Sequence, residues 1–144
     1  MADLKETVQV LKRAPLFQTL NNRQLERLAR RFVEREYEAG DTIVTQGKGG
    51  EGFFIITSGK ADVIRKRLDG AEVVVNKLEE ADFFGELALL DDGPRTASVV
   101  ATEPAECLVL TRWDFFGALK EDVDTAIAIL QEVAKRFRLA LDTL

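Results

Sequence analysis

The chain has 144 residues, 46% of them hydrophobic and 31% charged, which suits one globular domain with one core. Its net charge of -5 argues against a general nucleic-acid binder, because neutralising a phosphate backbone requires a basic face. The chain has no histidine, which excludes histidine-based catalysis and the imidazole metal sites of most zinc and non-haem iron enzymes.

Targeting and redox signals are also lacking. Cys107 is the single cysteine, so no internal disulfide is expected, and its place in an apolar run predicts a buried structural thiol. The first six residues lack the basic head and apolar stretch of a signal peptide. No apolar run approaches the ~18 residues that a membrane span requires. We therefore expect a cytoplasmic location.

Residues 1–36 are predicted to be helical. Leu4, Val8 and Leu11 recur at helical spacing, and Pro15 breaks that run. Asn21 and Gln24 have the spacing of a capping box, which predicts the start of a second helix. Several arginines of this segment form either a solvated face or a surface for a phosphate or a partner: Arg27, Arg30, Arg31 and Arg35.

Residues 37–111 change to short runs rich in β-branched and aromatic residues, separated by turn residues. The predicted strands are 42–45, 53–56, 61–64, 72–75, 98–101 and 107–110. Asp69-Gly70 is the strongest hairpin signal, because a tight primed turn needs positive φ. Many short strands at this spacing predict an antiparallel barrel or jelly roll.

Residues 112–144 return to a helical pattern, and no internal repeat indicates a second domain within 1–144. An apolar seam alternates spacings of four and three: Val123, Ile127, Leu130, Ala134, Phe137, Leu141 and Leu144. Such a seam either pairs with a second subunit, as in a coiled coil, or lies on the barrel of its own chain.

The segment 84–97 departs from simple patterning. Gly85 lets a ligand approach the backbone at the start of a predicted helical turn, whose N–H groups suit an anion. Arg95, stiffened by Pro94, can grip a phosphate through paired hydrogen bonds. Glu86 can accept from a sugar hydroxyl. These parts describe a site for a phosphorylated sugar, although Glu86 and Arg95 could equally form a salt bridge that closes the loop.

The run Phe84-Gly85-Glu86-Leu87-Ala88-Leu89-Leu90 followed by Pro94-Arg95-Thr96-Ala97 resembles the phosphate-binding cassette of cyclic nucleotide-binding domains. Shorter runs also resemble that family: Ala14-Pro15-Leu16-Phe17, Gly40-Asp41, Gln46-Gly47, Phe53-Phe54-Ile55-Ile56 and Ser58-Gly59-Lys60-Ala61-Asp62-Val63. The resemblance implies an α+β fold, with an antiparallel β jelly-roll barrel, N-terminal helices and a C-terminal helical lid. It implies cyclic AMP or cyclic GMP as the ligand, and neither a metal nor a further cofactor.

The resemblance also implies roles by position. The ligand-binding residues would be Gly85, Glu86, Leu87, Ala88, Arg95, Thr96 and Ala97. Glu86 would accept from the ribose 2′-hydroxyl, Arg95 would pair with the cyclic phosphate, and backbone N–H groups of Leu87 and Ala88 would face the ligand. Phe137 either stacks on the base as a cap or is an ordinary seam residue.

The function implied is a regulatory sensor, not an enzyme, whose ligand shifts the C-terminal helix. An effector domain or a second copy of the chain would read that helix, with no nucleic acid bound and no membrane inserted. The family's transcription factors continue into a helix-turn-helix, and we expect no such module within these residues. Ala81 stands where the family commonly has glycine. The alternative is a degenerate cassette domain that serves only protein interaction, and retention of Gly85, Glu86 and Arg95 favours a working pocket.

Overall fold

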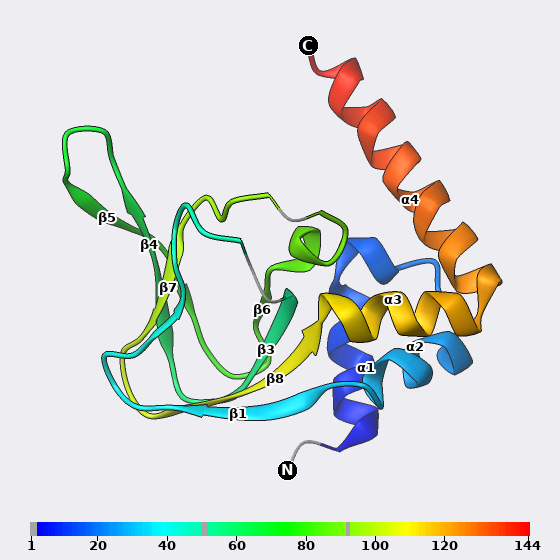
Figure 1. Ribbon diagram of the computed structural model, residues 1–144, viewed down its shortest axis with the longest axis horizontal. Helices are drawn as coiled ribbons and strands as arrows, with labels where there is room; N and C mark the ends of the chain where they lie inside the picture. The colour runs from blue at the N-terminus through cyan, green and yellow to red at the C-terminus, as the bar shows by residue number, and fades with distance from the viewer. Residues whose placement is uncertain (1–2, 50–51, 92) are drawn as a thin grey trace. The chain divides into compact units, whose positions relative to one another are not determined.

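The computed structural model describes residues 3–49, 52–91 and 93–144. These residues divide into two compact units. The β unit is Phe32–Arg112, and the helical unit joins the chain before Phe32 to Trp113–Leu144. Figure 1 labels the elements of each unit along the chain.

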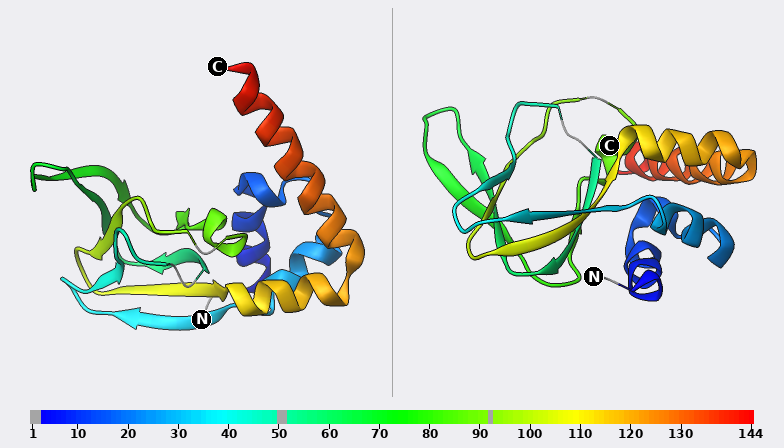
Figure 2. Two further views of the ribbon diagram at one scale, coloured as in Figure 1. Left: turned by 45° about the horizontal axis from the view of Figure 1, so that its top comes forward. Right: turned by 60° about the horizontal axis from the view of Figure 1, so that its bottom comes forward.

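The β unit contains two four-stranded antiparallel sheets. One has the order β1-β8-β3-β6, with bounds Val33–Tyr37, Ala105–Thr111, Gly52–Ser58 and Phe83–Phe84. The other has the order β2-β7-β4-β5, with bounds Thr42–Val44, Ser98–Ala101, Ala61–Lys66 and Glu72–Leu78. The β4–β5 hairpin extends beyond its neighbours in both views of Figure 2. A short 3₁₀ helix, η2 (Glu86–Leu89), follows β6.

Both sheets contribute side chains to one hydrophobic core, as inward-facing residues of a two-layer β structure do. Its buried members are Val44, Phe54, Ile56, Ala61, Leu78, Val99, Cys107 and Val109. Phe54 of β3 stacks on Phe84 of β6, with ring centroids 4.8 Å apart. This stack places β6, and with it the start of the cassette, against the core.

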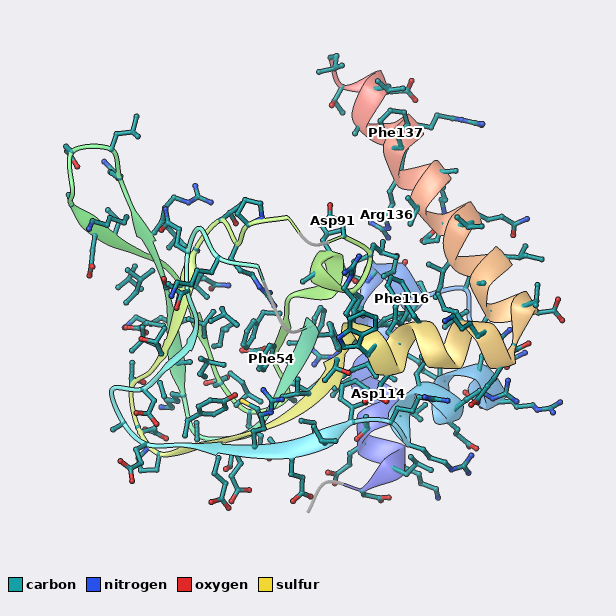
Figure 3. The ribbon with its side chains drawn as sticks, in the orientation of Figure 1. Phe54, Asp91, Asp114, Phe116, Arg136 and Phe137 are labelled. Atoms are coloured by element: carbon teal, nitrogen blue, oxygen red, sulfur yellow. The ribbon has the colours of Figure 1, made fainter. Side chains whose placement is uncertain are left out.

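The helical unit holds α1 (Leu4–Arg13), η1 (Pro15–Phe17), α2 (Asn22–Ala29), α3 (Arg112–Glu121) and α4 (Val123–Asp142). The predicted capping box is confirmed: Asn21 and Gln24 exchange side-chain and backbone hydrogen bonds of 2.9 Å. Three of the arginines that we assigned to a solvated or partner surface form ion pairs inside this unit, and Arg30 pairs with Glu26 of its own helix at 3.7 Å. Arg27 contacts Asp122 at 3.4 Å, and Arg31 contacts Asp114 of α3, which Figure 3 labels.

Helix α4 buries one side and exposes the predicted apolar seam. Its buried residues are Thr125, Ile129 and Glu132. The seam predicted from spacing lies on the opposite side and is exposed, with Leu130 68% and Phe137 65% accessible. Within the described residues, no helix is long and apolar enough to cross a membrane.

The prediction of helices flanking antiparallel sheets is confirmed. Two separate sheets are what the structure gives, so closure into a barrel stays a prediction. The helical prediction for residues 1–36 is wrong at its end, because β1 begins at Val33 and pairs with β8, Val33 opposite Val109. The three charged residues at the centre of Val33-Glu34-Arg35-Glu36-Tyr37 are not typical of a strand. This strand forms through pairing with a partner far along the chain.

Candidate functional site: an anion pocket in the β unit

The cassette and the sheet β2-β7-β4-β5 together line a pocket of about 520 Å³. The sheet contributes the apolar side chains of Val44, Val63 and Val99. The cassette contributes Phe84, Gly85, Glu86, Leu87, Ala88, Asp91, Gly93, Pro94, Arg95, Thr96 and Ala97. All seven ligand-binding residues implied by the resemblance therefore lie around one cavity. Its volume falls within the range of 300–1,000 Å³ that is usual for small-molecule sites.

Gly85 stands at the N-cap of η2 with φ 89°, a left-handed conformation that favours glycine. A Cβ at this position would lie 2.5 Å from Arg95 Nη1 and 2.5 Å from Gly52 O. Only glycine therefore fits between the arginine and the backbone of β3. The helical turn predicted after Gly85 is present as η2. Its Ala88 N–H donates to Gly85 O at 3.0 Å, so this N–H serves the turn rather than facing the pocket freely.

The Arg95 side chain is held before any ligand arrives. Its Nη2 donates to Gly52 O at 2.8 Å, and its guanidinium carbon lies 6.0 Å from the centroid of the Phe54 ring. Nε is buried and has no hydrogen-bond partner within the described residues. Burial lowers the pKa of the guanidinium, which nevertheless stays charged at neutral pH. A half-buried cation with one unsatisfied donor is well suited to an anion.

The main chain of Arg95 is fixed by the segment after β2. Gly47 N donates to Arg95 O at 2.8 Å, and Arg95 N donates to Lys48 O at 2.9 Å. Gly49 forms an isolated antiparallel bridge with Pro94. Residues 47–49 therefore place the backbone from which the arginine reaches into the pocket. The sequence offered only the glycines of Gln46-Gly47 and Gly49 as a signal for this contact.

Glu86 directly follows Gly85 and lines the same pocket. Within the described part of the chain, no ion pair joins Glu86 to Arg95. The side-chain hydrogen bond of Arg95 goes to a main-chain oxygen instead. The salt-bridge alternative that the spacing left open is therefore not the arrangement found, and Arg95 lines the pocket with its side chain held by β3.

Two residues at the site were not predicted: Asp91 is one of several unpredicted residues of the pocket lining, and Phe54 lies outside that lining. Asp91 lines the pocket, and its side chain accepts from Gly93 N at 2.9 Å. Phe54 lies beneath the Arg95 guanidinium. Phe137 belongs to α4 in the helical unit (Figure 3), so its role as a cap stays a prediction. Residues 3–49, 52–91 and 93–144 contain no cluster of three or more side chains arranged to hold a metal.

Several known proteins are similar to this chain in sequence. The family model described as "Cyclic nucleotide-binding domain" matches residues 34–122. The chain is 43% identical over 100 residues to a cAMP-dependent protein kinase regulatory subunit of Mycosarcoma maydis, covering 67% of this chain and 19% of that protein. It is 34% identical over 130 residues to the Cyclic AMP receptor protein of Thermus thermophilus, covering 90% of this chain and 60% of that protein.

A solved structure extends the likeness to three dimensions. The N-terminal domain of a transcriptional regulator from Streptomyces coelicolor A3(2) superposes with a TM-score of 0.84 at 33% identity, and the match covers 94% of each chain. The chain spans less than two thirds of the two curated relatives named above. The family match covers more than half of the chain, including the cassette and all eight strands but β1's first residue. The chain belongs to the family of cyclic nucleotide-binding domains.

Proposed function

We propose that this chain is a regulatory domain that binds a cyclic nucleotide in the pocket of the β unit. The observation that carries the proposal is the half-buried Arg95 guanidinium, whose Nε has no partner within the described residues. Beside it, Gly85 lines the same pocket, and its lack of a Cβ leaves room for the guanidinium. A cyclic phosphate carries one negative charge and supplies the acceptor oxygens that such a donor lacks.

The remaining parts of the ligand fit the other pocket residues. Glu86 accepts from the ribose 2′-hydroxyl, because it lines the pocket one residue from Gly85. The base lies on the apolar side chains of Val44, Val63 and Val99, which offer dispersion contacts to any purine. Thr96 can hydrogen-bond to either adenine or guanine, so the pocket lining itself discriminates weakly between cyclic AMP and cyclic GMP. We favour cyclic AMP over cyclic GMP because both curated relatives are named for cyclic AMP.

The regulatory output passes through α4. A ligand that binds better when α4 occupies one position shifts the population towards that position by its difference in affinity. Phe137 closes over the base in that state, and the exposed seam of α4 contacts an effector domain or a second copy of the chain. No reaction is assigned to the protein, and we place it in the cytoplasm.

Calorimetric titration of the purified 144-residue chain with cyclic AMP, cyclic GMP and 5′-AMP tests the binding proposal. We expect one site per chain, with cyclic AMP bound most tightly and 5′-AMP, which has a different phosphate shape and charge, bound most weakly. Absence of binding by both cyclic nucleotides to a folded protein would refute the proposal. The chain would then fit the degenerate domain that acts only in protein contacts.

Analytical sedimentation of the wild type and of Leu130→Glu gives their oligomeric states. It thereby distinguishes pairing of the α4 seam with a second copy from contact with an effector domain. Pairing with a second copy predicts a dimer that Leu130→Glu dissociates, because a charge at the centre of an apolar seam is costly to bury. A monomeric wild type would leave an effector domain as the partner of this face.

A further inference from the structure

Gln46 lies in the segment between β2 and β3, outside the lining of the pocket, and its side chain is nevertheless held by hydrogen bonds. Gln46 follows β2 and makes two hydrogen bonds to one residue of β4. Its Nε2 donates to Lys66 O at 3.1 Å, and its Oε1 accepts from Lys66 N at 2.7 Å. The side-chain amide thus pairs with the main chain of Lys66, as a neighbouring strand would.

The backbone of Gln46 is held from a third direction. Its N–H donates to Ser98 Oγ of β7 at 2.8 Å. Gln46 is therefore tied to two strands of the sheet β2-β7-β4-β5 at once. The next two residues, Gly47 and Lys48, hydrogen-bond to both main-chain polar groups of Arg95. The anchored Gln46 thus adjoins the two residues that hold the main chain of Arg95.

We propose that Gln46 is a positioning residue for Arg95, acting through Gly47 and Lys48 on the anion pocket. This role rests on the proposed binding of a cyclic nucleotide. Gln46 is absent from the pocket lining, so its effect on a ligand passes through the arginine. Glycine at 47, with φ 83°, gives the segment little stiffness of its own, so its course depends on hydrogen bonds such as those of the amide clamp and of the Gln46 N–H to Ser98 Oγ.

The chemistry of the clamp predicts which substitutions break it. Gln46→Ala removes both hydrogen bonds. Gln46→Glu keeps an acceptor for Lys66 N but puts a second acceptor against Lys66 O, so the clamp is lost while side-chain size is retained. Thr57→Val is the matched control, because it also removes one hydrogen bond from a side chain to a main-chain oxygen, that of Glu106, outside the pocket lining.

The test is a double-mutant cycle read by cyclic AMP titration, with a melting curve for each variant. Gln46→Ala and Gln46→Glu should each weaken binding about 10-fold in the wild-type background, since small misplacements of a binding group are costly. In the Arg95→Ala background the same substitutions should change affinity less than twofold, because the residue that they position is gone. Thr57→Val should leave affinity unchanged.

The outcomes separate the role from the function on which it rests. Wild-type affinity in folded Gln46→Ala and Gln46→Glu would overturn the positioning role and leave the binding proposal intact. An equal loss in both backgrounds would also overturn it, since Gln46 would then act independently of Arg95. A wild type that bound neither cyclic nucleotide would overturn the function first, and the role with it. Should Gln46→Ala fail to fold, Gln46→Glu carries the cycle.

Discussion

Replacing Arg95 with alanine tests the site most directly. In the ligand-free protein the change removes one hydrogen bond, from Nη2 to Gly52 O, together with a buried Nε that has no partner in the described chain. The lost bond costs about 1 kcal/mol, while removing an unsatisfied buried donor is favourable by a similar amount. We therefore expect the free energy of unfolding to change by no more than about 1 kcal/mol.

The effect on binding should be much larger. A cyclic phosphate would be left without its cation in a half-buried pocket, and breaking such a charge pair typically costs about 2–5 kcal/mol. At ~1.4 kcal/mol per decade, Arg95→Ala should weaken binding from about 30-fold to a few thousand-fold. Arg95→Lys should recover only part of this, because an ammonium keeps the charge but lacks the planar fork.

Calorimetric titration and a melting curve on the same preparations provide the assay. Arg30→Ala is the matched control, since it removes the same charge from the exposed arginine at the C-cap of α2 and should bind like the wild type. A folded Arg95→Ala protein with wild-type affinity would refute the site. A large fall in melting temperature without ligand, and no loss specific to nucleotides, would show that Arg95 is structural.

Three further predictions follow from particular residues. If Glu86 accepts from the ribose, 2′-deoxy cyclic AMP should bind the wild type about 10- to 150-fold more weakly than cyclic AMP. Glu86→Ala should erase most of this difference in affinity. Equal binding of the two ligands by the wild type would exclude the role. Burial raises the pKa of the Cys107 thiol from 9.0 to about 11, so the unfolded chain loses this proton first as the pH rises. The free energy of unfolding should then fall by about 2–3 kcal/mol between pH 9 and 11, a component that urea titrations of Cys107→Ala should lack. Ala81 has φ 73°, so Ala81→Gly should raise the free energy of unfolding by about 0.5–1 kcal/mol, and a lower urea midpoint would contradict the strain.

The strands that the sequence pattern predicted are those whose signal is local. The hairpin predicted at Asp69-Gly70 is present between β4 and β5, but its turn is not the tight primed one: Gly70 N donates to Arg67 O, and Gly70 alone of the pair has positive φ, at 89°. The strand β1 was missed because it exists through its pairing with β8, more than 60 residues later in the chain. The two-residue strand β6 was missed for the same reason, since its two phenylalanines find their partners in β3. Long-range pairing leaves no periodic trace within one segment.

The cassette illustrates the same division at the site. Gly85, Glu86 and Arg95 lie within eleven residues of one another, so their type and spacing were readable directly. The groups that hold Arg95 could not be predicted from the sequence, because they lie more than 40 residues upstream: Gly52 O, Phe54 and the segment 47–49. The glycine at position 52 is required by the packing of the strands, because its φ is 148° and a Cβ there would lie 2.1 Å from Leu110 O. A glycine in the sequence can therefore indicate close packing of strands, but it does not indicate the hydrogen bond to Arg95.

An acidic chain can still hold an anion, because distance and burial weigh more than the sum of charges. The net charge of -5 is spread over the whole chain, and at ~0.1 M salt exposed charges beyond about 10 Å are largely screened. In the proposed complex Arg95 lies within hydrogen-bond distance of the phosphate, and its burial reduces that screening. Glu86 and Asp91 line the same cavity and oppose a second phosphate charge, while Glu86 can still accept from a hydroxyl. The pocket therefore suits one phosphate charge next to a hydroxylated sugar, and it disfavours the polyanion that composition alone had excluded.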